Sequence, residues 1–402
     1  MNARLIVSLA ALAAVHALAD TAAVLPFWNT SADTHQANLD WIGESIAETI
    51  RDALESRGVL TLERPDIDDS FHRLGLRERT GISEGSIIKI GEDLDAEQVV
   101  FGTFTFTPEA TTEEKPGAGM HGSLTISARI LDLKRLRLAP EFNETGSLED
   151  LATLQAHLAW RALALLAPKL APPESEFRTV RAAVRLDAEE NYMRGVLARD
   201  PEQKEKFFLQ AARLDPHFEH PCYQLGQIYY RKREYREAAD WLSKVSPDSP
   251  HYREAEFLLG LALFESTDYT GAQKAFQTIA ETVPLSEVFN NLGAAESRRN
   301  LPQAVDDFKK AADGDPHDAD YRFNLGYVLW KKGDFAAAAE HFRAVLAQHP
   351  DDRMAALLAE RCARKQGLTV ADARLIGLER LKTNYEERAY WQLKMMLEPK
   401  AP

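Results

Sequence analysis

The chain has 402 residues, 45% of them hydrophobic, and a formal net charge of −14. This length has room for two or three domains with a sizeable core. The negative charge argues against nucleic acid or an anionic membrane surface as a partner, because the average field of the protein would repel both.

The amino terminus reads as a cleavable export signal. Arg4 gives a positive start, residues 5–14 are apolar, and residues 17–19 form the small-x-small motif that a signal peptidase recognises. We expect cleavage between Ala19 and Asp20. The mature protein should then be periplasmic or secreted, with no membrane insertion after signal removal. A retained amino-terminal helix is the alternative.

Residues 20–172 alternate between strand and helix patterns, and a cluster of prolines at 168, 172 and 173 marks their end. In the helix predicted at 38–57, apolar residues recur in steps of three and four, and Gly58 favours its termination. We expect strands at 21–27, 59–62, 99–106 and 124–133, helices at 38–57, 86–94 and 148–166, and a loop at 108–122. This order predicts an α/β sandwich with a mixed sheet.

This layout resembles the amino-terminal domain of the periplasmic translocation protein TolB. The resemblance rests on the strand Val24–Phe27, the helix containing residues 41–43 (WIG), and a strand-rich end with Gly102 and residues 127–129. It implies an interaction module and not a catalyst. No propeller repeats follow, so the full role of TolB is not implied.

Glycines recur almost evenly in the second half of the chain. Gly195, Gly226, Gly260, Gly293 and Gly326 are separated by 31, 34, 33 and 33 residues. Such a period, with a small residue at one fixed place, is typical of a helical-hairpin solenoid in which each unit buries its apolar face on the next. Beyond most of these glycines an alanine follows at a constant distance, and a large apolar residue comes one helical turn later.

Residues 173–350 therefore resemble a tetratricopeptide repeat array. The clearest copy matches the family pattern at Leu325, Gly326, Gly333, Asp334, Phe335, Ala338, Phe342 and Pro350. The unit of Gly195 has a shortened turn, and the unit of Gly293 lacks the turn glycine and aromatic residue. A non-repeating helical domain is the alternative. The predicted fold class is α/β plus all-α, with residues 351–402 as a helical cap that includes two helices within 372–397.

The resemblance also predicts a binding surface, because the first helices of such hairpins line a concave groove. The side chains that it places on the wall of this groove are His220, Tyr223, Gln227, Tyr230, Glu254, Phe257, Leu261, Phe264, Asn290, Phe323, Tyr327 and Trp330. Aromatic residues anchor interfaces well, although each could instead pack against the next repeat. The set describes a groove for an extended or helical peptide, whose backbone the amides of Asn290, Asn291 and Asn324 can hold.

Motifs for chemistry are few. The sequence has no phosphate loop, zinc-protease, serine-hydrolase or paired CxxC motif. His217, His220 and Cys222 carry zinc-type ligands, but the repeat register turns them apart, so we expect no metal site. Glu44 and Glu48 stand one helical turn apart, and we interpret them as the solvated face of their helix. We expect no catalytic residues and no cofactor.

The leading hypothesis is an exported, non-enzymatic adaptor that holds a partner protein or peptide in the concave groove. The first alternative is an enzyme or ligand sensor with a pocket near residues 29–36 of the α/β domain and the repeats as a regulatory arm. The second is a self-assembling scaffold, which would make the protein a homo-oligomer. We expect no disulfide between Cys222 and Cys362, because several repeats should separate them.

Overall fold

The structure is a computed structural model that describes residues 21–31, 39–76, 82–109, 121–180, 184–370, 372–387 and 390. The predicted signal at residues 1–19, most of residues 29–36, where the alternative hypothesis places a pocket, and residues 391–402 of the predicted cap lie outside the described residues. Contacts divide the chain into two compact units, one ending at Pro221 and the other running from Cys222 to Tyr390. Helices assigned to the first repeat by sequence therefore group with the α/β part.

The first unit is built on a mixed sheet. Its strands are β1 (Ala22–Val24), β2 (Trp28–Asn29), β3 (Gln98–Pro108), β4 (Gly122–Asp132), β5 (Arg137–Leu138) and β6 (Phe142–Ser147). β1 and β2 run parallel to β3, whereas β4 runs antiparallel to β3, β5 and β6. Pro26 lies between β1 and β2, and it lacks the donor that a continuous ladder would need. The mixed sheet predicted from the sequence is confirmed.

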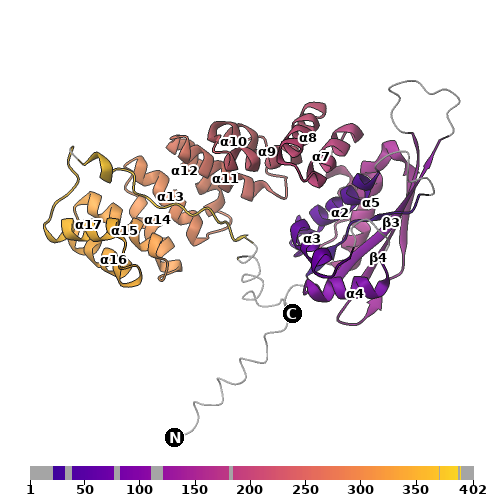
Figure 1. The fold of residues 1–402 in the computed structure, drawn as a ribbon, viewed down its shortest axis with the longest axis horizontal. Helices are drawn as coiled ribbons and strands as arrows, with labels where there is room; N and C mark the ends of the chain where they lie inside the picture. The colour runs from indigo at the N-terminus through magenta and orange to yellow at the C-terminus, as the bar shows by residue number, and fades with distance from the viewer. Residues whose placement is uncertain are drawn as a thin grey trace, which may run out of the picture. The chain divides into compact units, whose positions relative to one another are not determined.

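Helices pack beside this sheet and continue into the first hairpin (Figure 1). They are α2 (Asp40–Glu55), α3 (Arg64–Arg73), α4 (Glu84–Asp93), the 3-10 turn η1 (Leu148–Asp150), α5 (Leu151–Leu166), α6 (Glu174–Val180), α7 (Leu186–Leu197) and α8 (Pro201–Leu214). Gly58 follows α2 with a φ of 77°, the left-handed conformation that ends helices. The predicted helices at 38–57, 86–94 and 148–166 are all present within a few residues.

One strand prediction in this unit is wrong, and helix α3 was missed. Residues 59–62 do not form a strand, because only an isolated bridge joins Thr61 to Ala22. Helix α3 was not expected, since its segment is mostly polar. It begins with Pro65 in its first turn and buries Ile67 and Phe71, which lie four residues apart on one face.

The second unit is a stack of helical hairpins, as the glycine period predicts. Its helices are α9 (His220–Arg231), which begins in the first unit, α10 (Tyr235–Leu242), α11 (Tyr252–Glu265), α12 (Tyr269–Ala280), α13 (Ser286–Arg298), α14 (Ala304–Gly314), α15 (Ala319–Lys332), α16 (Phe335–Gln348) and α17 (Arg353–Ala363). The short 3-10 turn η2 (Ala373–Leu375) follows. Among the described residues, no helix combines the length and the apolar character that crossing a membrane would require.

The periodic glycines mark the places where the two helices of a hairpin cross. A Cβ atom added to Gly195, Gly226, Gly260, Gly293 or Gly326 would meet Phe208, Leu242, Phe276, Phe308 or Phe342 respectively. Each of these large residues comes from the second helix of the same hairpin. The small residue therefore makes room for the large one, and the repeat pattern in the sequence is a packing pattern in the structure.

The cysteines lie in separate cores of the second unit. Cys222 packs with Ala238, Leu242 and their neighbours, whereas Cys362 packs with Phe342 and residues of α17. Both are buried free thiols.

The carboxyl-terminal part differs from its prediction. Helix α17 forms part of the helical cap expected at 351–402, but residues 376–386 are not helical. They run as an extended chain along the side of α13 and α15, drawn in yellow in Figure 1. We call residues 375–387 the C-terminal segment. The prediction of two helices within 372–397 is wrong for it.

Candidate functional site

The candidate site is the face of α11, α13 and α15 on which the C-terminal segment lies. These are the first helices of successive hairpins, and their side chains were predicted to line the groove. In this structure, the chain's own segment occupies that groove.

Three asparagines, which we call the amide ladder, hold the backbone of the segment. Asn324 donates to the carbonyl oxygen of Arg380 at 2.7 Å and accepts from its N–H at 2.8 Å. Asn291 makes the same pair of bonds with Lys382, both at 2.8 Å, and Asn290 also donates to the Arg380 carbonyl. All three amides are fully buried. Because the bonds reach only main-chain groups, the amide ladder recognises an extended backbone whatever its sequence.

The position of the ladder follows from the repeat. Asn291 and Asn324 each stand two residues before their repeat glycine, so equivalent turns of α13 and α15 present equivalent amides. Asn324 also donates to the side-chain oxygen of Asn290 at 2.7 Å, which fixes the orientation of both amides. The ladder is therefore a connected network whose polar atoms are paired.

A second set of contacts, which we call the carboxylate pocket, receives Glu379. Its side chain has 0% exposure. The Ser297 hydroxyl donates to its Oε1 at 2.7 Å, and Arg298 Nε lies 2.7 Å from its Oε2. Lys331 Nζ lies 3.8 Å from Oε1. A buried carboxylate is thus matched by two cations and a hydroxyl.

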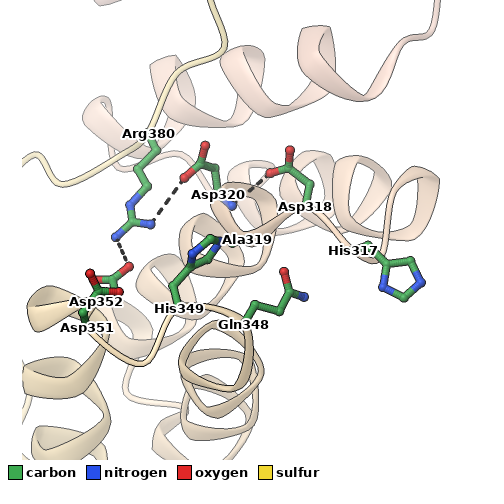
Figure 2. A pocket seen from close by; sticks show the side chains of 9 residues that line it. All are labelled: His317, Asp318, Ala319, Asp320, Gln348, His349, Asp351, Asp352 and Arg380. Atoms are coloured by element: carbon green, nitrogen blue, oxygen red, sulfur yellow. Dashed lines mark hydrogen bonds and ion pairs between the residues drawn. The ribbon is translucent and has the colours of Figure 1, made fainter.

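On the outer side of the segment, three aspartates form an acidic row. Arg380 lies between Asp320, at 3.3 Å, and Asp352, at 2.7 Å, and Figure 2 shows both ion pairs. Lys382 Nζ lies 2.8 Å from both Asp318 and Asp320. The row borders a surface depression of about 660 Å³ that His317 and His349 also line.

Aromatic contacts continue along the segment. Tyr385 stacks on Phe257 with ring centroids 4.9 Å apart, and the Arg380 guanidinium lies 3.6 Å from the centroid of Phe323. Tyr327 donates its hydroxyl to the Leu375 carbonyl at 2.7 Å. The segment is held over its whole length by helices of successive repeats.

Most of the predicted groove residues are therefore not open to solvent. Phe257, Leu261, Phe264, Asn290, Phe323, Tyr327 and Trp330 are buried. Trp330 donates to the Gln366 carbonyl at 2.8 Å, so it also fixes the turn after α17. For these side chains, the prediction of an accessible groove does not describe the structure, because the C-terminal segment and the hairpin cores cover them.

The predicted residues of the first repeats have other partners. Tyr223 donates to Glu254 at 2.8 Å, and Gln227 accepts from Arg231 at 3.1 Å. Tyr230 is half-buried and packs edge-on against Tyr235. His220 belongs to the first unit, where its Nε2 lies 2.8 Å from Asp52.

Sequence reasoning missed the cations of the carboxylate pocket. Arg298 and Lys331 each follow their repeat glycine by five residues, on neighbouring turns of α13 and α15. This shared distance from the repeat glycine is the sequence signal that could have identified the two cations. The segment that they bind gave no signal of its own, because its composition suits a helix.

Behind the groove, Glu296 of α13 approaches Asp307 of α14. Burial, then the charge and hydrogen bond of Asp307, raise the pKa of Glu296 from 4.5 to about 8. Its Oε1 accepts from the Gln273 amide at 3.1 Å. An acid with a raised pKa in the folded chain stabilises the fold fully below pH 4.5, and this stability declines as pH rises to about 8.

We therefore expect Glu296→Gln to remove part of the loss of folding stability that occurs as pH rises. The variant should be more stable than the parent by about 1 kcal/mol or more at pH 8, with the difference shrinking towards pH 5. Urea denaturation at a series of pH values measures this. A difference independent of pH would contradict the assignment.

The first unit contains a separate cavity of about 240 Å³, lined by α2, α5, α7 and His220. In it Tyr192 donates to Glu48 at 2.6 Å, and Ser45 donates to Glu189, whose pKa is raised by burial. Glu44, on the same helix, is buried and paired with Arg64. The interpretation of Glu44 and Glu48 as a solvated face is wrong, because α3 and α7 cover that side of α2.

No group of three or more His, Cys, Asp or Glu side chains suited to a metal ion occurs among the described residues.

Comparisons with known proteins agree with the repeat architecture. Residues 223–287 and 294–372 match the family model of the tetratricopeptide repeat. Over these residues the helical hairpins of the second unit match tetratricopeptide repeats, a type of fold that is generally a non-catalytic scaffold. A comparison with curated proteins gave no match, and the resemblance to the TolB amino-terminal domain is not confirmed.

Solved structures resemble the chain over less than half of its length. MamA from Desulfovibrio magneticus RS-1 is 24% identical over 42% of this chain and 99% of its own, with a TM-score of 0.37. YrrB, described as a tetratricopeptide repeat protein with an unusual peptide-binding site, is 22% identical over 44% of this chain and 92% of its own, with a TM-score of 0.40. PilF of Pseudomonas aeruginosa is 19% identical over 44% and 83%, with a TM-score of 0.36.

Proposed function

We propose that the protein is an exported, non-enzymatic adaptor that binds an extended segment of a partner polypeptide in the concave groove of its repeats. The amide ladder carries this proposal. Asn290, Asn291 and Asn324 satisfy main-chain donors and acceptors of a bound strand-like segment, a mode of recognition that any polypeptide backbone can use.

We include export in this proposal because the amino terminus has the pattern of a cleavable signal. A positive start, an apolar stretch and the small-x-small motif at 17–19 support it. Amino-terminal sequencing of the protein from its native cell should find Asp20 as the first residue. If the mature protein still begins with Met1, the signal is not cleaved, and both export and the periplasmic location would be contradicted.

Site-specific photocrosslinking in the full chain tests partner binding. A benzophenone amino acid in place of the half-buried Tyr230 should give an adduct with a partner polypeptide in the native compartment. The same group in place of Lys309, an exposed residue of α14, should not. Identical adducts at both positions, or none at either, would contradict binding through the groove.

A second candidate function is small-ligand sensing by the first unit, and the 240 Å³ cavity with Glu48, Glu189 and Tyr192 favours it. A thermal-shift screen of the full chain against small amines and metabolites tests it. A ligand whose shift disappears in Tyr192→Phe would support sensing. Shifts that this variant leaves unchanged would count against the cavity.

A further inference from the structure

The groove does more than hold a backbone, because its carboxylate pocket places two cations side by side. Arg298 Nε and Lys331 Nζ both face the carboxylate of Glu379, which is completely buried. Burial lowers the pKa of Lys331, and the charge of Arg298 lowers it further, against the opposing effect of Glu379. Without a carboxylate, two like charges would stand together with no anion to compensate them.

The groove itself holds these cations in place. The Arg298 guanidinium lies 5.3 Å from the ring centroid of Phe264 and 5.5 Å from that of Tyr269. Lys331 lies 5.5 Å from the ring of Tyr327 and donates to the Ser297 carbonyl at 2.9 Å. Because these contacts come from repeat residues, the pocket is organised before any segment binds, which favours affinity for a carboxylate.

The acidic row adds a second requirement, which concerns the residues one and three places after the carboxylate in the bound segment. Arg380 and Lys382 face Asp318, Asp320 and Asp352, which the helix ends of α15 and α17 present. These pairs are partly exposed, so each contributes little to affinity. Their arrangement nevertheless disfavours an acidic residue at either place, since like charges would then meet.

We propose that the groove selects partner segments with a carboxylate followed by basic residues one and three places on, and that the C-terminal segment is an internal competitor with this pattern. The inference rests on the proposed function, that the groove binds partner polypeptides. It adds which segments are bound and why the groove is closed in the isolated chain.

The competition is effective because the segment is tethered. The short connection from α17 gives it an effective concentration on the order of millimolar at the groove. A partner binds only the fraction of molecules in which the segment has left, so its apparent affinity falls by that fraction. A substitution that weakens binding of the C-terminal segment to the groove, without altering the groove, should therefore strengthen binding of an external peptide.

The test uses the full chain with Glu379→Gln, which removes the carboxylate that the pocket receives and leaves the residues of the pocket intact. A fluorescent peptide with the sequence of residues 375–387 is titrated by anisotropy, beside the same peptide with glutamine at the place of Glu379. The variant should bind the native peptide at least about tenfold more tightly than the parent chain does. It should also prefer that peptide to the glutamine peptide by at least about tenfold.

Two further chains complete the experiment. Thr383→Ala changes an exposed residue of the segment and should bind the native peptide as the parent does. Tyr385→Ala loosens the segment through its contact with Phe257, so it should show the same peptide preference even if Glu379→Gln folds poorly.

The outcomes separate the two proposals. If both loosened chains are folded and bind neither peptide, the groove does not accept segments in trans, and the proposed function fails. If they bind both peptides equally, groove binding stands and selection of a carboxylate is overturned. If they bind no more tightly than the parent, the segment is not a competitor.

Discussion

Replacing Asn324 by leucine should release the C-terminal segment and destabilise the second unit. The side chain is fully buried and makes hydrogen bonds with the N–H and carbonyl of Arg380 and with Asn290. Leucine has a similar size but can make none of them, so several buried polar groups would lose their partners. Each such loss costs about 1–3 kcal/mol, and we expect a total near 3 kcal/mol.

Trypsin measures the release directly, because Arg380 and Lys382 are the cleavage sites that the ladder holds. Cleavage after these residues should accelerate at least about tenfold in Asn324→Leu, in step with a lower urea midpoint. Gln348→Leu, an exposed substitution of the same type on α16, should change neither quantity. Equal cleavage in both variants would show that the ladder does not secure the segment.

The repeats could be predicted because the glycine and the large residue that fills its space lie in one hairpin. The pair Gly326 and Phe342 is fixed by local geometry, so its spacing recurs in each unit. The sequence also indicated that the amides of Asn290, Asn291 and Asn324 can hold a peptide backbone, and in the structure the backbone that they hold belongs to this chain. In these cases, the sequence distance between residues determines their distance in space.

The C-terminal segment could not be predicted in this way. Its leucines and charged residues suit a helix, and no property of the segment itself indicates an extended chain. What decides its conformation is the groove, since the amide ladder binds its backbone and the carboxylate pocket binds Glu379. The groups that bind the segment lie far from it in sequence: Asn291 and Ser297 are 91 and 82 residues from their partners, and Asn324 is 56 residues from Arg380.

Glu44 illustrates the same limit in the first unit. Its place on α2 beside an apolar stripe indicates a solvated residue when the helix is considered alone. Arg64 of α3 covers it, and burial raises the pKa of Glu44 while the charge of Arg64 opposes that rise. A helical period reports which residues share a face, but it does not report how many neighbours the helix has.

Replacing Gly43 by alanine should have the largest effect in the first unit. The glycine lies in α2 where the helix crosses the chain between β1 and β2, and its carbonyl accepts from the N–H of Phe27 at 3.2 Å. A Cβ atom there would overlap the Phe27 carbonyl oxygen, and it would lie 2.9 Å from the carbonyl carbon and 3.1 Å from the Phe104 ring. Backbone cannot yield as a side chain can, so we expect a loss of about 3 kcal/mol or more.

Gly85→Ala is the matched control, because the same change in α4 meets nothing closer than the Ser83 hydroxyl at 3.8 Å. Alanine favours a helix more than glycine does, so this variant should be neutral or more stable by up to about 1 kcal/mol. Amide hydrogen exchange in β3, measured on the full chain, reports the stability of the sheet that Phe104 belongs to. Exchange should accelerate strongly in Gly43→Ala and not in Gly85→Ala. Equal protection of β3 in the two variants would mean that α2 can move away from the sheet without loss, and that the close crossing at Gly43 does not hold this unit together.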